Sequence, residues 1–434
     1  MRVLVVGDGG REHALCWALK RDTPDADVFA APGNPGTAQL GTNLAIPVTA
    51  QDDLVRAARD HRIDFTIIGP EAPLAAGLGD ALRKSGHAVF GPGAAAARIE
   101  SSKAFAKDVM HRAGIPTAAS ETFTALDSAL AYIERHDEPL VVKASGLAAG
   151  KGAIVCETRA AARSAARAML ADGAFGDAGR EVVIEDYLEG EELSVLALTD
   201  GEQVLVLPAA QDHKRLGQGD TGPNTGGMGA YCPVTIATPP LLERVRREVL
   251  QAALRELAVR GAPYAGVLYA GLMIAADETP YVLEFNCRFG DPETQALLPV
   301  LPGVTRHLAD IAAGAWKPAD TALRAHRAAV ATVLAAPGYP DKPDVGATID
   351  VPRDIEPGTL VFHAGTSRAP DGTLRVRGGR VLAVTGVGDT VAAAHDQSVR
   401  GCELIGFRGK TYRRDIAWRE IGAGKGERAG AARG

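Results

Sequence analysis

Short apolar runs alternate with helix-like segments over the first hundred residues. The apolar runs predict buried strands, and the segments between them have apolar positions at helical spacing. This alternation favours a parallel sheet with helices on both faces, that is, a doubly wound α/β domain over residues 1–102. The expected strands are 2–6, 28–30, 64–68 and 88–90, and the expected helices are 11–20, 52–61 and 74–85.

The pattern changes after residue 102. Two segments predict hairpins, 194–207 around an Asp-Gly turn and 268–285, while 211–230 is expected to be a long glycine-rich loop. Valine-rich runs and glycine turns after residue 325 favour a smaller β-rich domain, and 421–434 is expected to be a disordered tail. The other expected elements are helices 102–113, 159–171 and 240–260 and strands 139–143, 153–156 and 181–184.

Composition narrows the class of protein. Apolar residues make up 46% and charged residues 23% of 434 positions, so neither a disordered chain nor a membrane protein is expected. No apolar stretch approaches the length of a membrane span, and a net charge of −6 provides no overall field for nucleic acid. The five cysteines are widely spaced without a C-x-x-C pair, which fits a reducing cytoplasm. The 50 glycines are in excess, and this predicts loops where backbone approaches a ligand.

The segment from Gly7 to His13 is predicted to contain the end of a strand, a glycine turn and the start of a helix. Free backbone N–H groups and a helix N-terminus suit an anion at Gly9 and Gly10. The segment misses the dinucleotide fingerprint, because the last required glycine would fall at Glu12. A small phosphorylated substrate or a purely structural turn therefore remain the two main interpretations.

A second glycine-rich segment runs from Lys143 to Gly152. Its spacing differs from a P-loop, and a strand follows it where a P-loop opens a helix. We therefore interpret it as a hairpin flap whose backbone N–H groups and lysines, Lys143 and Lys151, could cover phosphates. The alternative is a flap that is merely flexible.

The segment from Glu284 to Glu293 carries candidate metal ligands. Glu284 and Asn286 are two apart on a predicted strand and share one face, whereas Phe285 faces the core. Carboxylate and amide oxygens suit Mg²⁺, and Arg288 just beyond the strand could meet an anion. Ordinary exposed polar residues are the other interpretation.

The basic residues Lys214 and Arg215 lie in the predicted 211–230 loop. A loop of this length without secondary structure is usually functional or disordered. Its basic residues and glycines favour contact with an anionic substrate, and no partner for His213 can be identified from sequence.

Together these motifs resemble the glycinamide ribonucleotide synthetases, also called phosphoribosylamine–glycine ligases, of the ATP-grasp superfamily. They follow the family order over residues 1–420. The matching stretches are VLVVGDGGREHAL, IIGPEAPL, ESSKAFAKD, KASGLAAGKG, VIEDYLEGEELS, QDHKRLGQGDTGPNTGGMGAY, YAGLMI, EFNCRFGDPETQ, VFHAGT, GGRVLAVT and YRRDIAWR. Small departures are Ser145 for a common Asp, Asp186 for Glu and Ala417 for Gly.

The resemblance implies a multidomain α/β and α+β fold with a central two-lobed ATP-grasp unit. The implied divisions are an N-terminal domain 1–102, a core lobe 103–118 with 192–322, a lid lobe 119–191, a β-rich C-terminal domain 323–420 and a tail 421–434. It also implies a cytoplasmic monomer whose partners are small-molecule substrates, with no nucleic acid and no membrane.

The implied reaction joins glycine to 5-phosphoribosylamine with ATP and Mg²⁺ or Mn²⁺, through glycyl phosphate, in the second step of purine synthesis. The resemblance places the metal on Glu284 and Asn286, and catalytic roles on Arg288, Lys143, Asp212 and Asp291, the two aspartates being candidates for a base that the amine may not need. It places ATP on Lys103, Lys143, Gly146, Gly150, Lys151, Gly152, Glu185, Asp186, Tyr187, Leu188 and Glu192. It places the other substrates on Gly9, Gly10, Asp212, Lys214, Arg215, Asn224, Gly226, Gly227, Arg288 and Asp291.

Two alternatives remain at this point. One is a related ATP-grasp ligase that uses another acid and amine. The other is a nucleotide-binding regulator without catalysis, which the presence of Lys143, Glu284, Asn286 and Arg288 disfavours.

Overall fold

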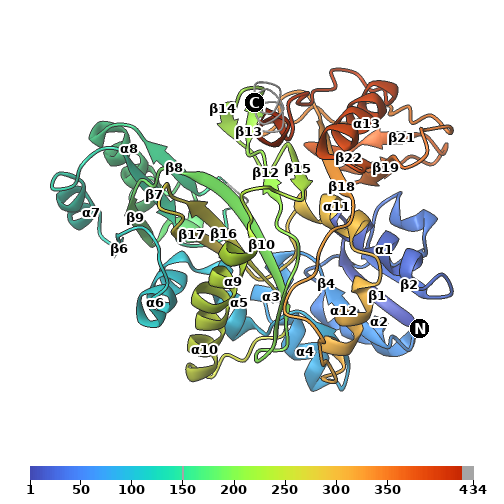
Figure 1. Cartoon of the computed structure of the whole chain (residues 1–434), viewed down its shortest axis with the longest axis horizontal. Helices are drawn as coiled ribbons and strands as arrows, with labels where there is room; N and C mark the ends of the chain where they lie inside the picture. The colour runs from blue at the N-terminus through green and yellow to red at the C-terminus, as the bar shows by residue number, and fades with distance from the viewer. Residues whose placement is uncertain (149–150, 423–434) are drawn as a thin grey trace, which may run out of the picture.

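The computed structural model describes residues 1–148 and 151–422 (Figure 1). Gly150, expected in the flap, and tail residues 423–434 lie outside the described part. The tail prediction is wrong at its start, because 421–422 belong to a short helical turn whose Ile421 N–H donates to the Ala417 carbonyl at 3.0 Å. None of the helices within the described ranges has the length and apolar character that crossing a membrane requires.

The N-terminal unit is built on a five-stranded parallel sheet in the order β3-β2-β1-β4-β5. Its strands β1 and β4 are almost wholly buried, which explains the continuous apolar runs in the sequence. The predicted helix 74–85 is two helices, because Gly77 breaks it with φ of +88°. The elements are β1 Arg2–Gly7, α1 Gly10–Asp22, β2 Asp27–Pro32, β3 Thr42–Asn43, α2 Gln51–Asp60, β4 Phe65–Ile68, α3 Glu71–Ala75, α4 Leu78–Lys84, β5 Ala88–Phe90 and α5 Ala94–Ser101.

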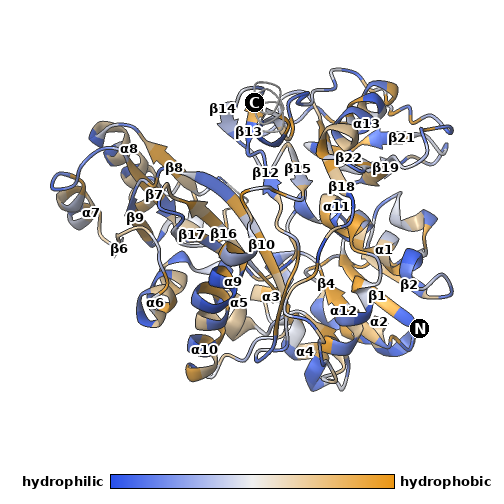
Figure 2. Ribbon diagram, viewed as in Figure 1, coloured by the Kyte–Doolittle hydropathy of each residue, from blue (hydrophilic) through white to orange (hydrophobic). Residues whose placement is uncertain are grey.

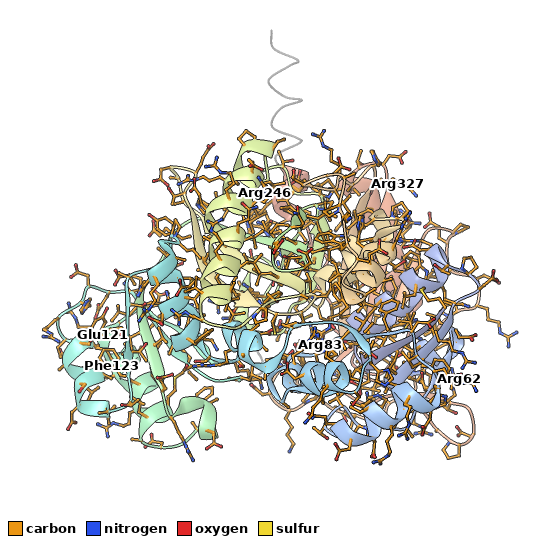
Figure 3. The ribbon with its side chains drawn as sticks, turned by 90° about the horizontal axis from the view of Figure 1, so that it is seen from below. Arg62, Arg83, Glu121, Phe123, Arg246 and Arg327 are labelled. Carbon is orange, nitrogen blue, oxygen red and sulfur yellow. The ribbon has the colours of Figure 1, made fainter. Side chains whose placement is uncertain are left out.

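A second unit projects from one end of the molecule, where Figure 3 labels Glu121 and Phe123. Its antiparallel sheet has the order β6-β9-β7-β8, and two helices pack on it around a core drawn from residues 123–184. We call this unit the lid lobe. Its elements are β6 Ser120–Phe123, α7 Leu126–Ile133, β7 Leu140–Ala144, β8 Ala153–Cys156, α8 Arg159–Leu170 and β9 Val182–Asp186.

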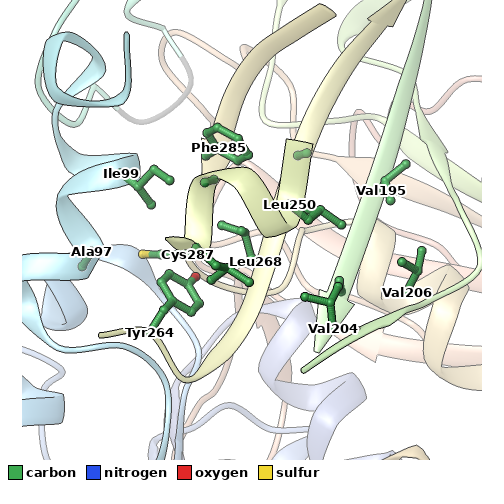
Figure 4. Close-up of a cluster of buried hydrophobic side chains, with 14 of the residues drawn as sticks. Ala97, Ile99, Val195, Val204, Val206, Leu250, Tyr264, Leu268, Phe285 and Cys287 are labelled. Atoms are coloured by element: carbon green, nitrogen blue, oxygen red, sulfur yellow. The ribbon is translucent and has the colours of Figure 1, made fainter. Parts of the chain in front are cut away.

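The core lobe contains the four-stranded antiparallel sheet β11-β10-β16-β17, and both predicted hairpins are confirmed. Phe285 packs with Leu268 and Ile99 in the interior, as Figure 4 shows. In Figure 2 the helices over this sheet carry both hydrophobic and hydrophilic colours, as expected of amphipathic helices. The elements are α6 Lys103–Ala113, β10 Glu191–Thr199, β11 Val204–Val206, α9 Pro239–Val245, a π-turn Arg246–Leu250, α10 Gln251–Val259, β16 Gly266–Ile274, β17 Pro280–Asn286, α11 Glu293–Leu297 and α12 Val304–Ala312.

The prediction of a structureless loop over 211–230 is wrong. Two of its strands, β12 and β15, join the C-terminal sheet β12-β15-β18-β22-β19, and two more form the hairpin β13–β14. The partner strand β18 begins almost a hundred residues later, so local pattern could not reveal the pairing. The elements are β12 Gln211–Asp212, β13 Arg215–Gly217, β14 Thr221–Asn224, β15 Gly229–Cys232, β18 Ala328–Ala335, β19 Leu360–His363, β20 Thr366–Arg368, β21 Leu374–Val376, β22 Arg380–Gly388 and α13 Val391–Leu404.

Candidate active site

A cavity of about 390 Å³ lies where the N-terminal unit, the lid lobe, the core lobe and the C-terminal sheet meet. Cationic side chains outnumber acidic ones along its wall, so the cavity suits an anionic ligand. The cations are Arg11, Lys103, Lys107, Lys143, Arg288 and Arg380, and the acids are Glu71, Glu100, Glu284 and Asp291.

Lys103 begins α6 at the cavity wall. Ser102 caps this helix, because its hydroxyl accepts from the Phe105 N–H at 3.2 Å. The Lys103 backbone N–H donates to the Ser145 carbonyl at 2.8 Å, and its Nζ donates to the Gly146 carbonyl at 3.3 Å. Helix α6 is thereby joined to the start of the flap. Burial lowers the pKa of the Lys103 ammonium.

Lys143 and Lys107 converge on the buried carboxylate of Glu185. Lys143 lies on β7, pairs with Glu185 and donates to the Leu283 carbonyl at 3.1 Å. Lys107 lies one helical turn beyond Lys103, and its Nζ is 2.7 Å from Glu185 Oε2. Burial raises the pKa of the Glu185 carboxyl, but the two ammonium groups outweigh burial and the net shift is downward. The side chain of Glu185 therefore orients two lysines of the cavity, a role that the sequence prediction of a nucleotide contact missed.

The flap residues Leu147, Ala148 and Gly152 line the cavity, but Lys151 does not. Its Nζ points the other way and donates to the Pro340 carbonyl at 2.9 Å, so the structure does not bring it to the other lysines. Gly146 packs so tightly that an added Cβ would lie 2.6 Å from Ala178 Cα. At Ser145 the hydroxyl donates to Glu181 at 2.9 Å and accepts from the Ala104 N–H at 3.1 Å, which holds the base of the flap.

The segment after β9 lies at the edge of the site. Asp186 and Tyr187 are exposed and Leu188 is half-buried, and none of the three lines the cavity. The Asp186 N–H already donates to the Ala119 carbonyl at 3.0 Å. Glu192 follows on β10 and forms an ion pair with Lys214.

Glu284 and Asn286 share one face of β17, as predicted, with Asn286 Nδ2 3.5 Å from Glu284 Oε1. Both line the cavity, opposite the buried face of Phe285. Burial raises the pKa of the Glu284 carboxyl. The positive charges of Lys214, Lys143, Lys103 and Arg288 lower this pKa by more than burial raises it, so it lies below its ordinary value. No cluster of three or more His, Cys, Asp or Glu side chains suited to a metal occurs among residues 1–148 and 151–422.

Arg288 is held by two carboxylates that the sequence analysis did not single out. Its guanidinium lies 2.9 Å from Glu100 Oε1 and 3.3 Å from Glu71 Oε2, and it donates to Asn286 Oδ1 at 3.0 Å. Glu100 also accepts from the Cys287 N–H at 2.8 Å. Burial raises the pKa of the Glu100 carboxyl. These contacts fix the Arg288 guanidinium beside the two candidate metal ligands.

The glycine turn before α1 lies against Asp291 of the core lobe. Gly9 caps α1, and its N–H donates to Glu12 Oε2 at 2.7 Å. The Arg11 N–H donates to Asp291 Oδ2 at 3.2 Å, so a carboxylate interacts with this helix N-terminus. At Gly10 a Cβ would lie 2.5 Å from Gln295 Nε2, so a larger residue would have to displace the end of the Gln295 side chain. Burial raises the pKa of Asp291, but Arg380 and Arg11 outweigh it and the carboxyl stays ionised.

The substrate residues predicted in 211–230 are only partly brought to the cavity. Gly226 lines it, and Arg380 from β22 donates to the Gly226 carbonyl and to the Asp291 carbonyl, the latter at 2.7 Å. Gly227 has φ of +107° and packs against Pro292. The side chains of Lys214, Arg215 and Asn224 and that of Asp212 lie outside the cavity lining.

Asp212 nevertheless lies in a strongly charged environment. Burial raises its pKa to about 7, Lys214 opposes the rise, and Glu293, Glu192 and Glu284 add to it. Lys214 thus provides positive charge near several carboxylates, and it forms an ion pair with one of them, Glu192.

Five functional candidates were missed from the sequence, namely Arg11, Glu71, Glu100, Lys107 and Arg380. Lys107 could have been found, because a residue four positions after Lys103 lies on the same helix face. Glu71 and Glu100 come from two helices of the N-terminal unit and Arg380 from the C-terminal sheet, and only the tertiary fold brings them to one cavity.

Models of the phosphoribosylglycinamide synthetase domains match most of the chain. The N domain matches residues 1–100, the ATP-grasp (A) domain 101–294 and the C domain 329–419. A phosphoribosylamine–glycine ligase of Ralstonia nicotianae is 48% identical over 425 residues, covering 97% of this chain and all of the relative. That of Pseudomonas aeruginosa is 47% identical over 430 residues, covering 98% and 100%.

Comparison with solved structures points to the same family as the sequence relatives. The phosphoribosylamine–glycine ligase of Thermotoga maritima has a TM-score of 0.86 at 35% identity and covers 96% of this chain and all of that one. The biotin carboxylase domain of 2-oxoglutarate carboxylase from Hydrogenobacter thermophilus has a TM-score of 0.72 at 18% identity, covering 95% and 91%, which shows the shared fold alone. The chain therefore belongs to the phosphoribosylglycinamide synthetase family of ATP-grasp ligases.

Proposed function

We propose that this chain joins glycine to 5-phosphoribosylamine, with cleavage of ATP to ADP and phosphate. The observation that carries the proposal is the single cavity in which Lys103, Lys107 and Lys143 face Glu284, Asn286 and Arg288. The relatives named phosphoribosylamine–glycine ligase cover nearly the whole chain, which supports the choice of substrates. The product is glycinamide ribonucleotide, and the reaction is the second step of purine synthesis.

ATP is assigned to the end of the cavity beneath the flap. The three lysines hold its phosphates, and the apolar side chains of Met110 and Val183 suit its adenine. The backbone of 185–188 remains our proposal for the adenine edge, and Glu192 for the ribose. Leu147, Ala148 and Gly152 would exclude water, which protects an acyl phosphate from hydrolysis.

ATP-grasp ligases use a divalent metal ion with ATP. Glu284 and Asn286 offer one carboxylate and one amide oxygen toward the cavity, and this donor set fits an ion that takes its other ligands from phosphate and water. We propose Mg²⁺, with Mn²⁺ as a substitute, because both ligands are hard oxygens. When bound, the ion supplies neutralising charge to the triphosphate.

The glycine carboxylate attacks the γ-phosphorus, ADP leaves, and the amine then attacks the acyl carbon and releases phosphate. Arg288 is placed to stabilise the negative charge that develops in both steps, because Glu71 and Glu100 hold its guanidinium next to Asn286. Burial raises the pKa of Asp212 to about 7, but its side chain lies outside the cavity lining, so we assign no base. Asp291 lines the cavity and stays ionised, which suits it to hold substrate. Gly9 and Gly10 are proposed for the phosphoribosyl group.

The enzyme is further proposed to act as a monomer in the cytoplasm. All five cysteines are free and buried, as expected in a reducing compartment.

Release of ADP tests the function. Purified protein with ATP, Mg²⁺, glycine and freshly prepared phosphoribosylamine should release ADP only when both co-substrates are present. ADP release that needs neither co-substrate, or that needs a different acid or amine, would reject the proposal. Failure to release ADP with any acid would favour a regulator that only binds nucleotide.

A further inference from the structure

The segment 413–419, near the end of the described chain, packs against the segment that carries Lys214. We propose that this C-terminal segment positions Lys214 in the active site, with Arg413 as the principal positioning residue. The inference rests on the proposed function only in treating Glu192, the ion-pair partner of Lys214, as part of the nucleotide site. It is carried by contacts on both sides of Lys214 in the chain.

On the C-terminal side of Lys214, Arg413 holds the backbone of Arg215. The Arg413 side chain is 1% exposed, and its Nη1 donates to the Arg215 carbonyl at 3.1 Å. The same nitrogen donates to Asp220 Oδ1 at 2.7 Å, so one guanidinium connects the start of β13 with the turn that precedes β14. Asp415 orients this guanidinium through contacts of 2.8 and 2.7 Å. A buried arginine with four such contacts to three residues is a rigid anchor.

The tip of the same hairpin is fixed by two further contacts. Asp415 Oδ2 accepts from the Gly219 N–H at 2.8 Å, and Arg419 Nη2 lies 2.6 Å from Asp220 Oδ2. Asp220 has φ of +53°, a conformation that a non-glycine residue rarely adopts without such support. The C-terminal segment therefore determines the shape of the turn as well as its position.

On the N-terminal side of Lys214, Ala417 holds His213. The Ala417 N–H donates to His213 Nε2 at 3.0 Å, and the His213 ring is 1% exposed. The His213 backbone pairs with β15, its N–H donating to the Gly229 carbonyl at 2.9 Å. Lys214 is thus flanked by two residues that contact 413–417, which leaves its backbone little freedom.

This placement directs the Lys214 side chain to the core lobe. Its Nζ pairs with Glu192 on β10, the residue proposed for the ribose of ATP. Displacing Lys214 would leave the Glu192 carboxylate without its counter-charge at that place. Weaker nucleotide binding is the expected consequence.

MgADP binding tests the inference without needing the ligase reaction. We would measure the Kd of MgADP by titration calorimetry for the wild type, Arg413→Met, Lys214→Met and the double variant, together with the melting temperature. Each single variant should raise the Kd at least about fivefold. The double variant should bind no more weakly than Lys214→Met, because Arg413 acts through Lys214.

A control variant separates positioning from general destabilisation. Arg260 is another largely buried arginine, paired with Glu256 and Asp108 away from the cavity. Arg260→Met should lower the melting temperature without changing the Kd. If Arg413→Met does not fold, Asp220→Asn replaces it, since this change removes the charge shared by Arg413 and Arg419 with little change in shape.

An unchanged Kd in Arg413→Met, or losses that multiply in the double variant, would overturn the positioning role. The proposed function fails by a different result, namely MgADP binding without any ligation of glycine.

Discussion

Glu185 and Lys107 lie with their charged atoms 2.7 Å apart in the interior of the site. Lys143 approaches the same carboxylate from β7, so one carboxylate lies between two ammonium groups. Burying three charges is costly, and the arrangement persists because each charge has a partner. Its effect is to hold two ammonium groups at the cavity wall before nucleotide arrives.

Replacing Glu185 by Gln should therefore destabilise the protein. Two buried ammonium groups lose their counter-charge, with an expected cost of about 3 kcal/mol and a weaker affinity for MgATP. Urea unfolding and nucleotide titration would measure both effects. Glu134→Gln, which removes an exposed ion pair with Arg163 in the lid lobe, is the matched control and should change stability by less than about 1 kcal/mol. Equal effects of the two variants would show that burial does not matter here.

Replacing Glu284 by Ala should abolish turnover and leave the fold intact. Its carboxylate opens to the cavity, while Phe285 supplies the packing on the opposite face. We expect ADP release to fall by about 100-fold or more, with a melting temperature within about 2 °C of wild type. Turnover near the wild-type rate would mean that the metal ligands have been assigned wrongly.

Ala417 adopts φ of +66°, in the left-handed region, where the family commonly has glycine. Ala417→Val should destabilise by about 2 kcal/mol or more, since a β-branched residue tolerates this conformation poorly. Ala417→Gly should change stability by no more than about 0.5 kcal/mol. Its relief of strain is offset by greater freedom of the unfolded chain and loss of a buried methyl group. Thermal melts of both variants test this, and a harmless valine would contradict the assigned conformation.

The stability should also depend on pH through two buried histidines. His13 on α1 accepts from the His363 backbone N–H at 2.8 Å. Burial lowers the pKa of His13 to about 3 and that of His363 to about 4, and the charges of His363 and Arg368, respectively, add to these shifts. The unfolded chain, with a pKa near 6.5, binds more protons between pH 6.5 and 4. The free energy of unfolding therefore falls on acidification, by about 1.4 kcal/mol per pH unit for each histidine in this window.

His363→Gln provides the test of this pH dependence. It removes one of the two titrating groups, so the slope of unfolding free energy between pH 6 and 4.5 should decrease by about 1.4 kcal/mol per pH unit. Urea unfolding at four pH values would measure the slope. A slope identical to that of the wild type would mean that His363 is protonated equally in the folded and unfolded states.

Local periodicity accounts for what could be predicted from the sequence. Glu284 and Asn286 share a face because strand residues alternate, and Lys143 falls on a strand because its neighbours are apolar. The parallel sheet of the N-terminal unit could be predicted because short apolar runs alternate with helix-like segments over the first hundred residues. The family resemblance supplied the overall architecture and the reaction.

Features that depend on distant residues could not be predicted in this way. The direction of Lys151 depends on Pro340, and the role of the Glu185 side chain depends on Lys107. Helix α5 was missed because its alanine-rich start has little amphipathic contrast. The domain divisions remain a prediction, although the sheet that contains β12 and β18 crosses the division expected near residue 323.

That shared sheet limits how the chain could be divided. A fragment that begins at residue 323 would keep β18 but lose β15, whose four residues pair with Ala329–Thr332 in register. It would expose a long apolar strand edge, a known starting point for aggregation. The complementary fragment would lose the 413–419 segment that we propose to position Lys214. Expression as two co-folding halves, or permutation of the termini into a surface turn, would have to keep β15 and β18 together for either piece to stay in solution.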